Sequence, residues 1–356
     1  MNKQWKIAGI NFDFRHMDHL LTFAHATENV EVCGVWHSDL NEVEAAVSAC
    51  SIPRECVFER WETCLEKAKP DVVLLCPATR DHCLWVERIA EAGCHVLMEK
   101  PFAANLAQAD RMIAAMAVAD RQLAVNWPLA WYPPHVTANR LLREGAIGEL
   151  QEVHFYDGNR GPILDRTQAH PAEPTLEEKR AHWYYDPDGG GSLLDYLGYG
   201  VVLATWFWQG RAPSEVATMA GGNPELAVDE QSVTMARYGN WVSTFQTRWG
   251  TLTDPWEFQT QPKCGFVLKG TEGTIGHFDY EDQIRLANHE CPQGRILPVD
   301  VATFPFRNPV EYFINCLEHN QSIEGPLSIE YNRIGQQIVD TAVKSLKERC
   351  TVNLIK

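Results

Sequence analysis

Three side chains, carried by two distant segments of this sequence, have the chemistry for proton transfer at a secondary alcohol. Lys100 follows the apolar run 94–98, and its ammonium can stabilise a neighbouring negative charge. Asp195 and Tyr199 follow a glycine-rich turn, 189–191, and their spacing of four residues places both on one face of a helix. Removing hydride from an alcohol requires loss of the hydroxyl proton. A tyrosine whose pKa is lowered by a nearby lysine can accept that proton, and the aspartate would orient the substrate hydroxyl or the tyrosine.

The first third of the chain has an alternating pattern that would place Lys100 at a ligand-binding edge. Residues 5–126 alternate between short apolar runs and amphipathic segments, which indicates an α/β fold with a doubly wound parallel sheet. The predicted strands are Trp5–Ile10, Val30–Trp36, Asp71–Cys76, Cys94–Met98 and Gln122–Asn126, and predicted helices include Leu40–Cys50, Arg80–Ala92 and Leu106–Ala119. Ligands of such sheets bind at the carboxyl ends of the strands, where Lys100 lies.

The rest of the chain has a different rhythm, which predicts an α+β domain with an open, mainly antiparallel sheet. The expected elements are a helix at Pro134–Glu144, a segment at Gln151–Arg160, a polar loop at 161–187, the Asp195 helix, alternating segments at Ser214–Ala220, Gln231–Tyr238, Trp241–Trp249 and Cys264–Lys269, and helices at Pro309–His319 and Ile329–Lys347. We expect a nucleotide-binding domain at 1–126 and a substrate-binding and oligomerisation domain at 127–356, whose C-terminal helices can pack back on the first.

Composition excludes several classes of protein. The net charge of −16, without clustered lysine and arginine, argues against nucleic-acid binding. The eleven cysteines include no Cys-x-x-Cys pair and the histidines do not recur at ligand spacing, so neither a disulfide framework nor a metal site is expected. The longest apolar stretch, Val201–Trp208, is too short to cross a membrane, and the first strand begins close to Met1, which leaves no room for a signal peptide. We expect a cytoplasmic protein.

Four segments together resemble the Gfo/Idh/MocA oxidoreductases. They occur in the family's order: Cys76–His82 resembles a loop after a strand, Glu91–Pro101 the most recognisable signature, Leu142–Leu150 the bridge into the second domain, and Gly189–Tyr199 the catalytic helix. The resemblance implies a Rossmann domain joined to a domain with an open antiparallel sheet, and a nicotinamide cofactor. It also supports Lys100 as the acid/base, so the choice between Lys100 and Tyr199 stays open.

Two departures from the family pattern bear on function. The usual Gly-x-Gly-x-x-Gly turn is here Gly9-Ile-Asn11-Phe-Asp-Phe14, with only its first glycine. Asn11 tolerates a left-handed backbone, so either the turn is rebuilt and still binds a dinucleotide, or nucleotide binding is lost. The second departure is Tyr199, where many members carry histidine. This tyrosine is similar to glucose–fructose oxidoreductase, to dimeric dihydrodiol dehydrogenase, and to relatives that use bound NAD⁺ for glycoside cleavage.

The resemblance also implies a set of cofactor contacts, which are Gly9, Asn11, Phe12, Asp13, His37, Ser38, Pro77, Thr79, His82, Glu99 and Lys100. Glu99 could equally anchor its loop. His37 stands where an acid would select NAD by binding the adenosine ribose, and Asp39 follows two residues later. His37 and Ser38 could accept the 2′-phosphate of NADP, and Asp39 could equally be only a helix N-cap. The sequence favours NAD over NADP weakly.

Aromatic residues near the expected cleft point to a carbohydrate, because ring faces pack against the C–H faces of sugars. The candidates for substrate contact are Trp127, Arg160, His182, Trp183 and Tyr184. These features predict an NAD(P)-dependent dehydrogenase or reductase acting on CH–OH groups of a sugar, cyclitol or related polyol, assembled as a homodimer or homotetramer through the second-domain sheet. The alternatives are an NAD-dependent glycosidase or lyase that works by transient oxidation and β-elimination, and a non-catalytic nucleotide sensor or binding protein.

Overall fold

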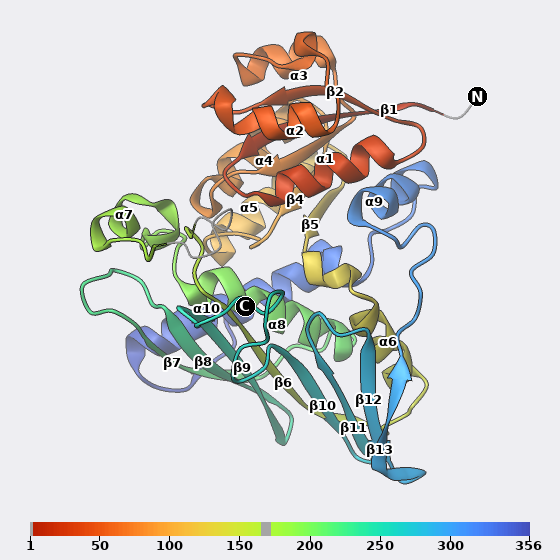
Figure 1. Cartoon of the computed structure of the whole chain (residues 1–356), viewed down its shortest axis with the longest axis vertical. Coiled ribbons are helices and arrows are strands. Elements are labelled where there is room, and N and C mark those ends of the chain that lie inside the picture. Colours follow the sequence, from red (N-terminus) through yellow and green to blue (C-terminus); the bar gives the residue numbers. More distant parts are fainter. Residues whose placement is uncertain (1–2, 165–171) are drawn as a thin grey trace. The chain divides into compact units, whose positions relative to one another are not determined.

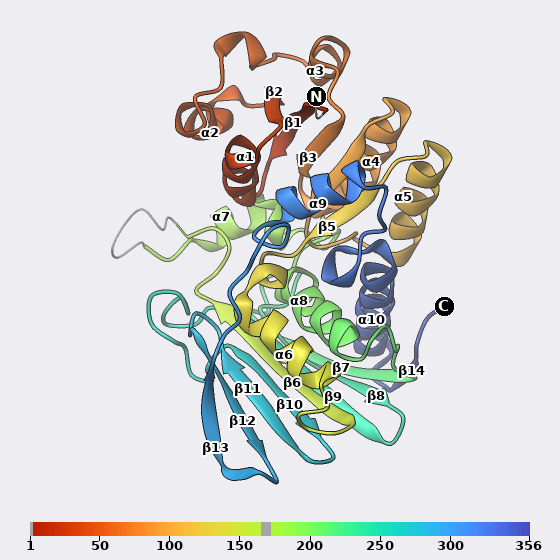
Figure 2. The same cartoon turned by 90° about the vertical axis from the view of Figure 1, so that its right-hand side faces the viewer.

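The computed structural model describes residues 3–164 and 172–356 (Figures 1 and 2). The chain divides into two compact units. One consists of Met1–Trp131 with Ala302–Arg333, and the other of Tyr132–Val301 with Ile334–Lys356. We call them the first and second units and describe each separately.

The first unit contains a five-stranded parallel sheet. Its strands are β1 (Trp5–Phe12), β2 (Val30–Trp36), β3 (Val72–Cys76), β4 (His95–Glu99) and β5 (Leu123–Asn126), in the order β2-β1-β3-β4-β5. Its helices are α1 (His16–Ala26), α2 (Glu44–Ala49), α3 (Trp61–Ala68), α4 (His82–Glu91), α5 (Leu106–Val118) and α9 (Pro309–Glu318), with single turns η1 (Leu40–Val43), η2 (Arg54–Cys56), η3 (Thr79–Asp81), η4 (Pro128–Trp131) and η6 (Gly325–Leu327). This confirms the predicted doubly wound fold.

Two glycines show that helices cover both faces of this sheet. A Cβ on Gly9 would lie 3.3 Å from the Met17 sulfur of α1, and a Cβ on Gly34 would lie 2.7 Å from the Cys64 sulfur of α3. Gly34 pairs with Ala8, the neighbour of Gly9, and successive residues of a strand point to opposite faces. The helices α1 and α3 therefore pack on opposite sides, and each needs a glycine for its close approach.

The second unit contains a nine-stranded sheet. Its strands are β6 (Leu150–Asn159), β7 (Glu215–Gly221), β8 (Gln231–Tyr238), β9 (Trp241–Trp249), β10 (Gly265–Gly270), β11 (Gly273–Phe278), β12 (Gln283–Asn288), β13 (Cys291–Pro298) and β14 (Val352–Asn353), in the order β13-β12-β11-β10-β6-β9-β8-β7-β14. Only the β6–β9 pair is parallel, so the sheet is mixed and mostly antiparallel, as predicted. The strands β11–β13 extend it beyond the predicted segments.

Helices cover one face of this sheet. They are α6 (Pro133–Arg143), α8 (Ser192–Phe207) and part of α10 (Ile329–Glu348), while α7 (Leu176–Ala181) and η5 (Trp183–Tyr185) lie within the predicted loop, of which 165–171 fall outside the described residues. The helix α8 comes very close to the sheet, because a Cβ on Gly200 would lie 2.6 Å from the Phe155 ring and 2.9 Å from the Phe245 ring. Figure 2 shows α6 and α8 over the same face.

The other face of the second sheet is open. Its central row runs through Met235, Thr244, His154 and Val267 on neighbouring strands, and Met235 and Val267 are exposed. In the described parts of the chain, no helix combines the length and apolar character needed to cross a bilayer.

Candidate active site

The topology of the first unit defines where a ligand would bind. The strand β2 pairs with one edge of β1, and β3 pairs with its other edge, so the strand order reverses at β1. In doubly wound sheets, ligands bind at the carboxyl ends of the strands where the order reverses in this way. Here that position, which we call the crevice, lies between the turn at the end of β1, which includes Asn11, and the loop after β3, which contains Ala78.

Asn11 adopts the left-handed backbone that an asparagine tolerates, with φ of 63°. Its side chain is buried, and its Nδ2 has no hydrogen-bond partner among the described residues. A buried amide without a partner is costly and unusual. Asn11 thus supplies both the turn geometry of a glycine and an unused donor at the crevice, which fits an anionic ligand such as a dinucleotide phosphate.

The backbone donors of this turn, by contrast, are already engaged. The Phe12 N–H donates to His37 Nδ1 at 3.2 Å, and the N–H groups of Asp13 and Phe14 both donate to the Cys76 carbonyl, at 3.1 and 3.4 Å. Such groups usually hold the pyrophosphate. The rebuilt turn therefore presents a side-chain donor in place of free backbone donors.

The Asp13 carboxyl points to the neighbouring loop. Its Oδ2 accepts a hydrogen bond from the Ala78 N–H at 3.2 Å. Partial burial of the carboxyl raises the pKa of Asp13, against the opposing influence of His37. Asp13 thus links the β1 turn to the β3 loop across the crevice.

Phe14 brings an aromatic ring to Lys100. The Lys100 ammonium lies 5.1 Å from the centroid of this ring, within the range of a cation–π interaction. The preceding residue, Glu99, is fully buried, and its carboxylate is within 2.7 Å of His16 Nδ1 and accepts from Asn126 Nδ2 at 2.9 Å. The two oxygens of Glu99 are thus both used to anchor the end of β4, which holds Lys100 in place.

The remaining predicted cofactor residues have varied surroundings. His82 is fully buried between the carbonyls of Phe102 and Pro77, at 3.3 and 3.1 Å, and burial lowers its pKa. His82 therefore positions the loop that carries the buried Pro77 and Thr79. Asp39 is the N-cap of η1, with Oδ1 accepting from the Asn41 N–H at 3.0 Å.

The carboxylate at the predicted adenosine ribose position, that of Asp39, is therefore already used as a helix cap. His37 is buried, its Nδ1 accepts from the Phe12 N–H, and its Nε2 is left as the donor. Ser38 is exposed.

In the second unit, Asp229 secures the start of the helix α8. The helix α8 follows Gly191, whose φ is 97° and whose Cβ would lie 2.7 Å from Asp229 Oδ1. Asp229 Oδ2 accepts from Ser192 Oγ at 2.7 Å and from the Leu193 N–H at 3.0 Å. Burial raises the pKa of Asp229 to about 6, although these hydrogen bonds oppose the shift. The glycine-rich turn is thus needed because a side chain at 191 would displace this cap.

Asp195 and Tyr199 are one turn apart on α8 and both are buried. Asp195 Oδ2 accepts from the Trp249 indole N–H at 3.3 Å. Tyr199 packs against Tyr196, with ring centroids 5.8 Å apart, and the Tyr196 hydroxyl is hydrogen-bonded to Asn159 Nδ2. The predicted spacing is thus present, and residues from β6 and β9 fix this part of the helix.

Trp249, which is hydrogen-bonded to Asp195, connects that residue to a group of aromatic side chains. Trp183 and Tyr184 are stacked with centroids 3.8 Å apart, and His182 stacks on Tyr184. Tyr184 meets Trp249 edge-on at 6.1 Å. These four residues, which we call the aromatic cluster, unite three of the predicted substrate residues with one that the sequence analysis did not select.

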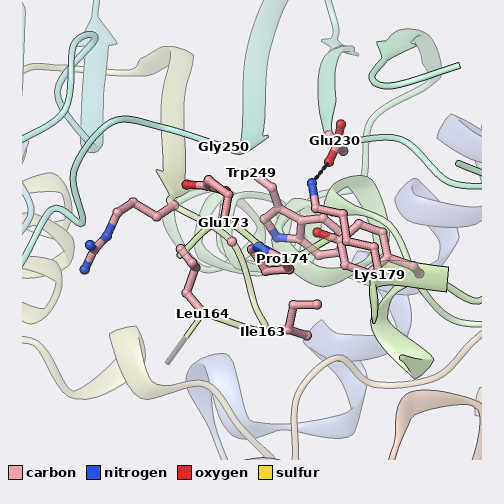
Figure 3. A pocket seen from close by; sticks show the side chains of 11 residues that line it. Ile163, Leu164, Glu173, Pro174, Lys179, Glu230, Trp249 and Gly250 are labelled. Carbon is pink, nitrogen blue, oxygen red and sulfur yellow. Dashed lines mark hydrogen bonds and ion pairs between the residues drawn. The ribbon is translucent and has the colours of Figure 1, made fainter. Parts of the chain in front are cut away.

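Trp249 of the aromatic cluster also lines a pocket (Figure 3). Its lining includes Arg160, Leu164 and Trp249 together with the Lys179–Glu230 ion pair, whose Nζ–Oε1 distance is 2.9 Å. Arg160 pairs with Asp254 at 2.9 Å and with Glu257 at 3.2 Å. Because two carboxylates already neutralise Arg160, this pocket is better suited to hydroxyl groups than to a carboxylate.

The predicted residues are distributed over both units. Lys100 and the cofactor candidates belong to the first unit, and Asp195, Tyr199 and the aromatic cluster belong to the second. Trp127 belongs to the first unit, where its indole N–H donates to Asn332 at 2.6 Å in a buried site, which indicates a structural role.

The structure also gathers residues that the sequence analysis overlooked. His135, His277 and Asp279 lie together in the second unit, with their ligand atoms within 4.8 Å of one another. The expectation of no metal site rested on spacing along the sequence. That spacing cannot detect a cluster formed by a helix and a distant strand.

Two family profiles match the sequence. The profile described as an oxidoreductase family with an NAD-binding Rossmann fold matches residues 4–127, and the one described as a GFO/IDH/MocA C-terminal domain matches residues 135–276. The chain is 32% identical over 149 residues to D-apiose dehydrogenase of Paraburkholderia graminis, a match that covers 41% of this chain and 38% of that protein. The aligned region thus spans well under two thirds of that relative's length.

Solved structures of similar fold cover the whole chain. Aldose–aldose oxidoreductase from Caulobacter crescentus, solved with glycerol, superposes with a TM-score of 0.80 at 17% identity. The match covers 99% of this chain and 100% of the oxidoreductase chain. Levoglucosan dehydrogenase, solved with NADH and levoglucosan, has a TM-score of 0.79 at 18% identity and covers 100% of both chains. At these identities the likeness establishes the fold.

Proposed function

The chain belongs to the Gfo/Idh/MocA family of oxidoreductases, and on that basis we propose that it is an NAD(P)-dependent dehydrogenase or reductase. Its substrate would be a secondary alcohol or ketone of a sugar, cyclitol or related polyol. The observation that carries this proposal is the Asp195–Tyr199 pair on α8, with Asp195 bonded to Trp249 of the aromatic cluster. In this proposal residues 1–126 hold the dinucleotide and 127–356 bind the substrate.

The protein's part in the reaction is to move a proton and to orient an alcohol. A bound nicotinamide would supply the hydride acceptor or donor. Tyr199 or Lys100 takes the hydroxyl proton when the alcohol is oxidised, and returns it when the ketone is reduced. Asp195, held by the Trp249 N–H, orients the substrate hydroxyl. The Phe14 ring and the anchored Glu99 keep the Lys100 ammonium in position.

The proposed substrate class follows from the aromatic cluster and the pocket. Stacked rings next to Asp195 offer faces for the C–H groups of a sugar, and Trp249 belongs to both the cluster and the pocket lining. The relative named D-apiose dehydrogenase and the neighbour named levoglucosan dehydrogenase support a carbohydrate.

NAD is the proposed cofactor, with NADP as the alternative. Asn11 would contact a phosphate through its buried amide, and His37 would face the adenosine ribose through Nε2. Asp39 would repel a 2′-phosphate group, because it is a nearby carboxylate. We further propose a cytoplasmic homodimer or homotetramer.

Turnover of variants tests the proposal. We would screen polyols and aldoses by nicotinamide absorbance with the wild type, and then assay Tyr199→Phe and Lys100→Met. Each substitution should lower kcat/KM by about 100-fold or more, because general acid–base catalysis contributes that much. Nucleotide binding by Tyr199→Phe should remain unchanged, because Tyr199 is not among the predicted cofactor contacts. Tyr238→Phe is the matched control, since the Tyr238 hydroxyl has no hydrogen-bond partner among the described residues.

Two outcomes would reject this proposal. Equal turnover by the wild type, Tyr199→Phe and Lys100→Met would remove these residues from the reaction. Release of an aglycone from a glycoside, without net formation of reduced nicotinamide, would assign the protein to redox-neutral cleavage.

A further inference from the structure

Two histidines and an aspartate meet in the interior of the second unit, and none of them has a role in the proposed reaction. His135 comes from the first turn of α6, His277 from β11, and Asp279 from the residues just after β11. Their exposed fractions are 0%, 1% and 3%. Asp279 Oδ1 lies 4.0 Å from His135 Nε2 and 3.8 Å from His277 Nε2.

Two of the polar atoms at this site, on His277 and Asp279, are not satisfied by hydrogen bonds among the described residues. Neither His277 Nε2 nor Asp279 Oδ1 has a hydrogen-bond partner within the described ranges of the chain. Buried polar atoms in native proteins are nearly always paired, and each exception needs an explanation such as an ion or ordered water. The separation of 3.8 Å is too long for a direct hydrogen bond between the two side chains, so a shared proton alone does not satisfy them.

The orientation of His277 is the one found in metal ligands. Its Nδ1 lies 3.1 Å from the Gln283 carbonyl, which fixes that nitrogen as the donor and leaves the Nε2 lone pair directed at Asp279. Metal-bound histidines usually donate their other ring N–H to a carbonyl or carboxylate in this way. The lone pairs of His277 Nε2 and Asp279 Oδ1 face each other at 3.8 Å, and a cation between them would remove their repulsion.

The surrounding charges also favour a cation. Asp157 is buried and close enough for its charge to act on Asp279. Arg285 is a cation whose charge acts on His277, and its guanidinium is hydrogen-bonded to Glu281 at 2.7 Å. Burial and the charge of Asp157 both disfavour the ionised form of Asp279, and a bound divalent ion would compensate for them.

We propose that His135, His277 and Asp279 bind one divalent transition-metal ion through two imidazole Nε2 atoms and one carboxylate oxygen, and that Zn²⁺ matches this ligand set best. Zn²⁺ takes histidine nitrogen and carboxylate oxygen at about 2.0–2.2 Å in tetrahedral geometry, so neighbouring ligand atoms lie about 3.3 Å apart. Small side-chain rotations would shorten the observed separations of the ligand atoms, 3.8 and 4.0 Å, to that value. A water molecule or another protein oxygen would take the fourth position. None of these three ligands takes part in the proposed reaction.

Metal content of the whole chain tests the site. We would express the wild type in medium supplemented with Zn²⁺ or Co²⁺, remove free metal by gel filtration, and measure bound metal by mass spectrometry. The wild type should hold about one equivalent, because the three ligands form a single site, and Co²⁺ should give the visible absorption of a tetrahedral N/O complex. His277→Gln and Asp279→Asn should lose most of this metal. His154→Gln should keep it, because His154 lies on the opposite face of the same sheet.

Two results would overturn the proposal. One is a folded wild type that holds no metal after growth and gel filtration with either ion. The other is full metal retention by His277→Gln and Asp279→Asn, which would mean adventitious binding elsewhere. If either variant fails to fold, the Co²⁺ spectrum of the wild type still decides, because an octahedral or absent spectrum contradicts a buried tetrahedral site.

Discussion

Asn11 combines two tasks that the family pattern gives to glycine and to backbone N–H groups. Its φ of 63° supplies the turn, and its buried Nδ2 supplies a donor at the crevice. The N–H groups of residues 12–14 are used inside the protein. The loss of glycines therefore does not by itself argue against nucleotide binding, because the Asn11 side chain offers a donor where the backbone N–H groups are engaged.

A pair of variants at this residue separates the two tasks. Asn11→Gly should leave the free energy of unfolding nearly unchanged, whereas Asn11→Ala should lower it by about 1 kcal/mol, because alanine is strained in the left-handed region. Both variants lose the amide donor, so both should weaken nucleotide binding about tenfold, the effect of one lost hydrogen bond. Chemical denaturation and calorimetric titration measure these effects. Unchanged affinity in Asn11→Gly would remove the donor from the site.

At the scale of elements, the close packing of α8 on the sheet sets the position of Asp195 and Tyr199. A Cβ at Gly200 would overlap the rings of Phe155 and Phe245. Gly200→Ala should therefore destabilise the protein by about 1–3 kcal/mol, the usual cost of an overpacked core, and should lower turnover by shifting the helix. Thermal denaturation followed by circular dichroism measures the first effect.

The control for this variant is Gly276→Ala in β11. A Cβ at Gly276 would find its nearest neighbour at 3.8 Å, an ordinary contact. The account of α8 would be wrong if both variants had the same melting temperature as the wild type.

Asp229 should make the stability of the protein depend on pH. Its pKa of about 6 is above that of an unfolded aspartate, near 3.9, so the folded state binds the proton more tightly. This contribution to stability is fully present below about pH 4 and is lost as the pH rises through about 6. At 1.36 kcal/mol per pKa unit it amounts to at most about 3 kcal/mol.

The variant Asp229→Asn removes this titration while keeping an acceptor for the start of α8. Between pH 4 and 7 its free energy of unfolding should fall less than that of the wild type, and urea denaturation at several pH values measures the difference. Parallel curves for the two proteins would show that Asp229 does not titrate in this range.

The elements were largely predictable from sequence because each has a local signal. Continuous apolar runs gave the strands of the first sheet, and β8 and β9 follow their alternating segments with the same bounds. The strands β11–β13 were not predicted, since their glycines, prolines and charged residues weaken the alternation. The predicted helix over Leu40–Cys50 begins as the single turn η1, because Asp39 caps it there.

The contacts that build the site were less predictable because they join residues far apart in the sequence. The i, i+4 spacing of Asp195 and Tyr199 is local and could be read directly. Nothing in the sequence pairs Asp195 with Trp249, or Asp13 with Ala78. The cluster of His135 and His277 is equally hidden, since only the packing of α6 on the sheet brings the two together.

At the scale of the whole molecule, the open face of the second sheet is the proposed contact between copies of the chain. Met235 and Val267 are 45% and 40% exposed in its central row. Met235→Lys combined with Val267→Lys should shift an oligomer toward the monomer, because two charges would have to be buried. Light scattering after size-exclusion chromatography measures the mass. The control is Val301→Lys, an exposed position outside the strands. A wild type that is monomeric at high concentration would contradict the proposed assembly.

The most direct test of the proposed function is nucleotide binding by the purified chain. We would first assay for nucleotide carried through purification, and then titrate with NAD⁺, NADH, NADP⁺ and NADPH by calorimetry. The rebuilt turn at Asn11 predicts that one oxidised and reduced pair binds, and Asp39 favours the NAD pair. If none of the four binds and none is carried through purification, the protein is not a nicotinamide-dependent oxidoreductase, and its first unit serves only as a scaffold.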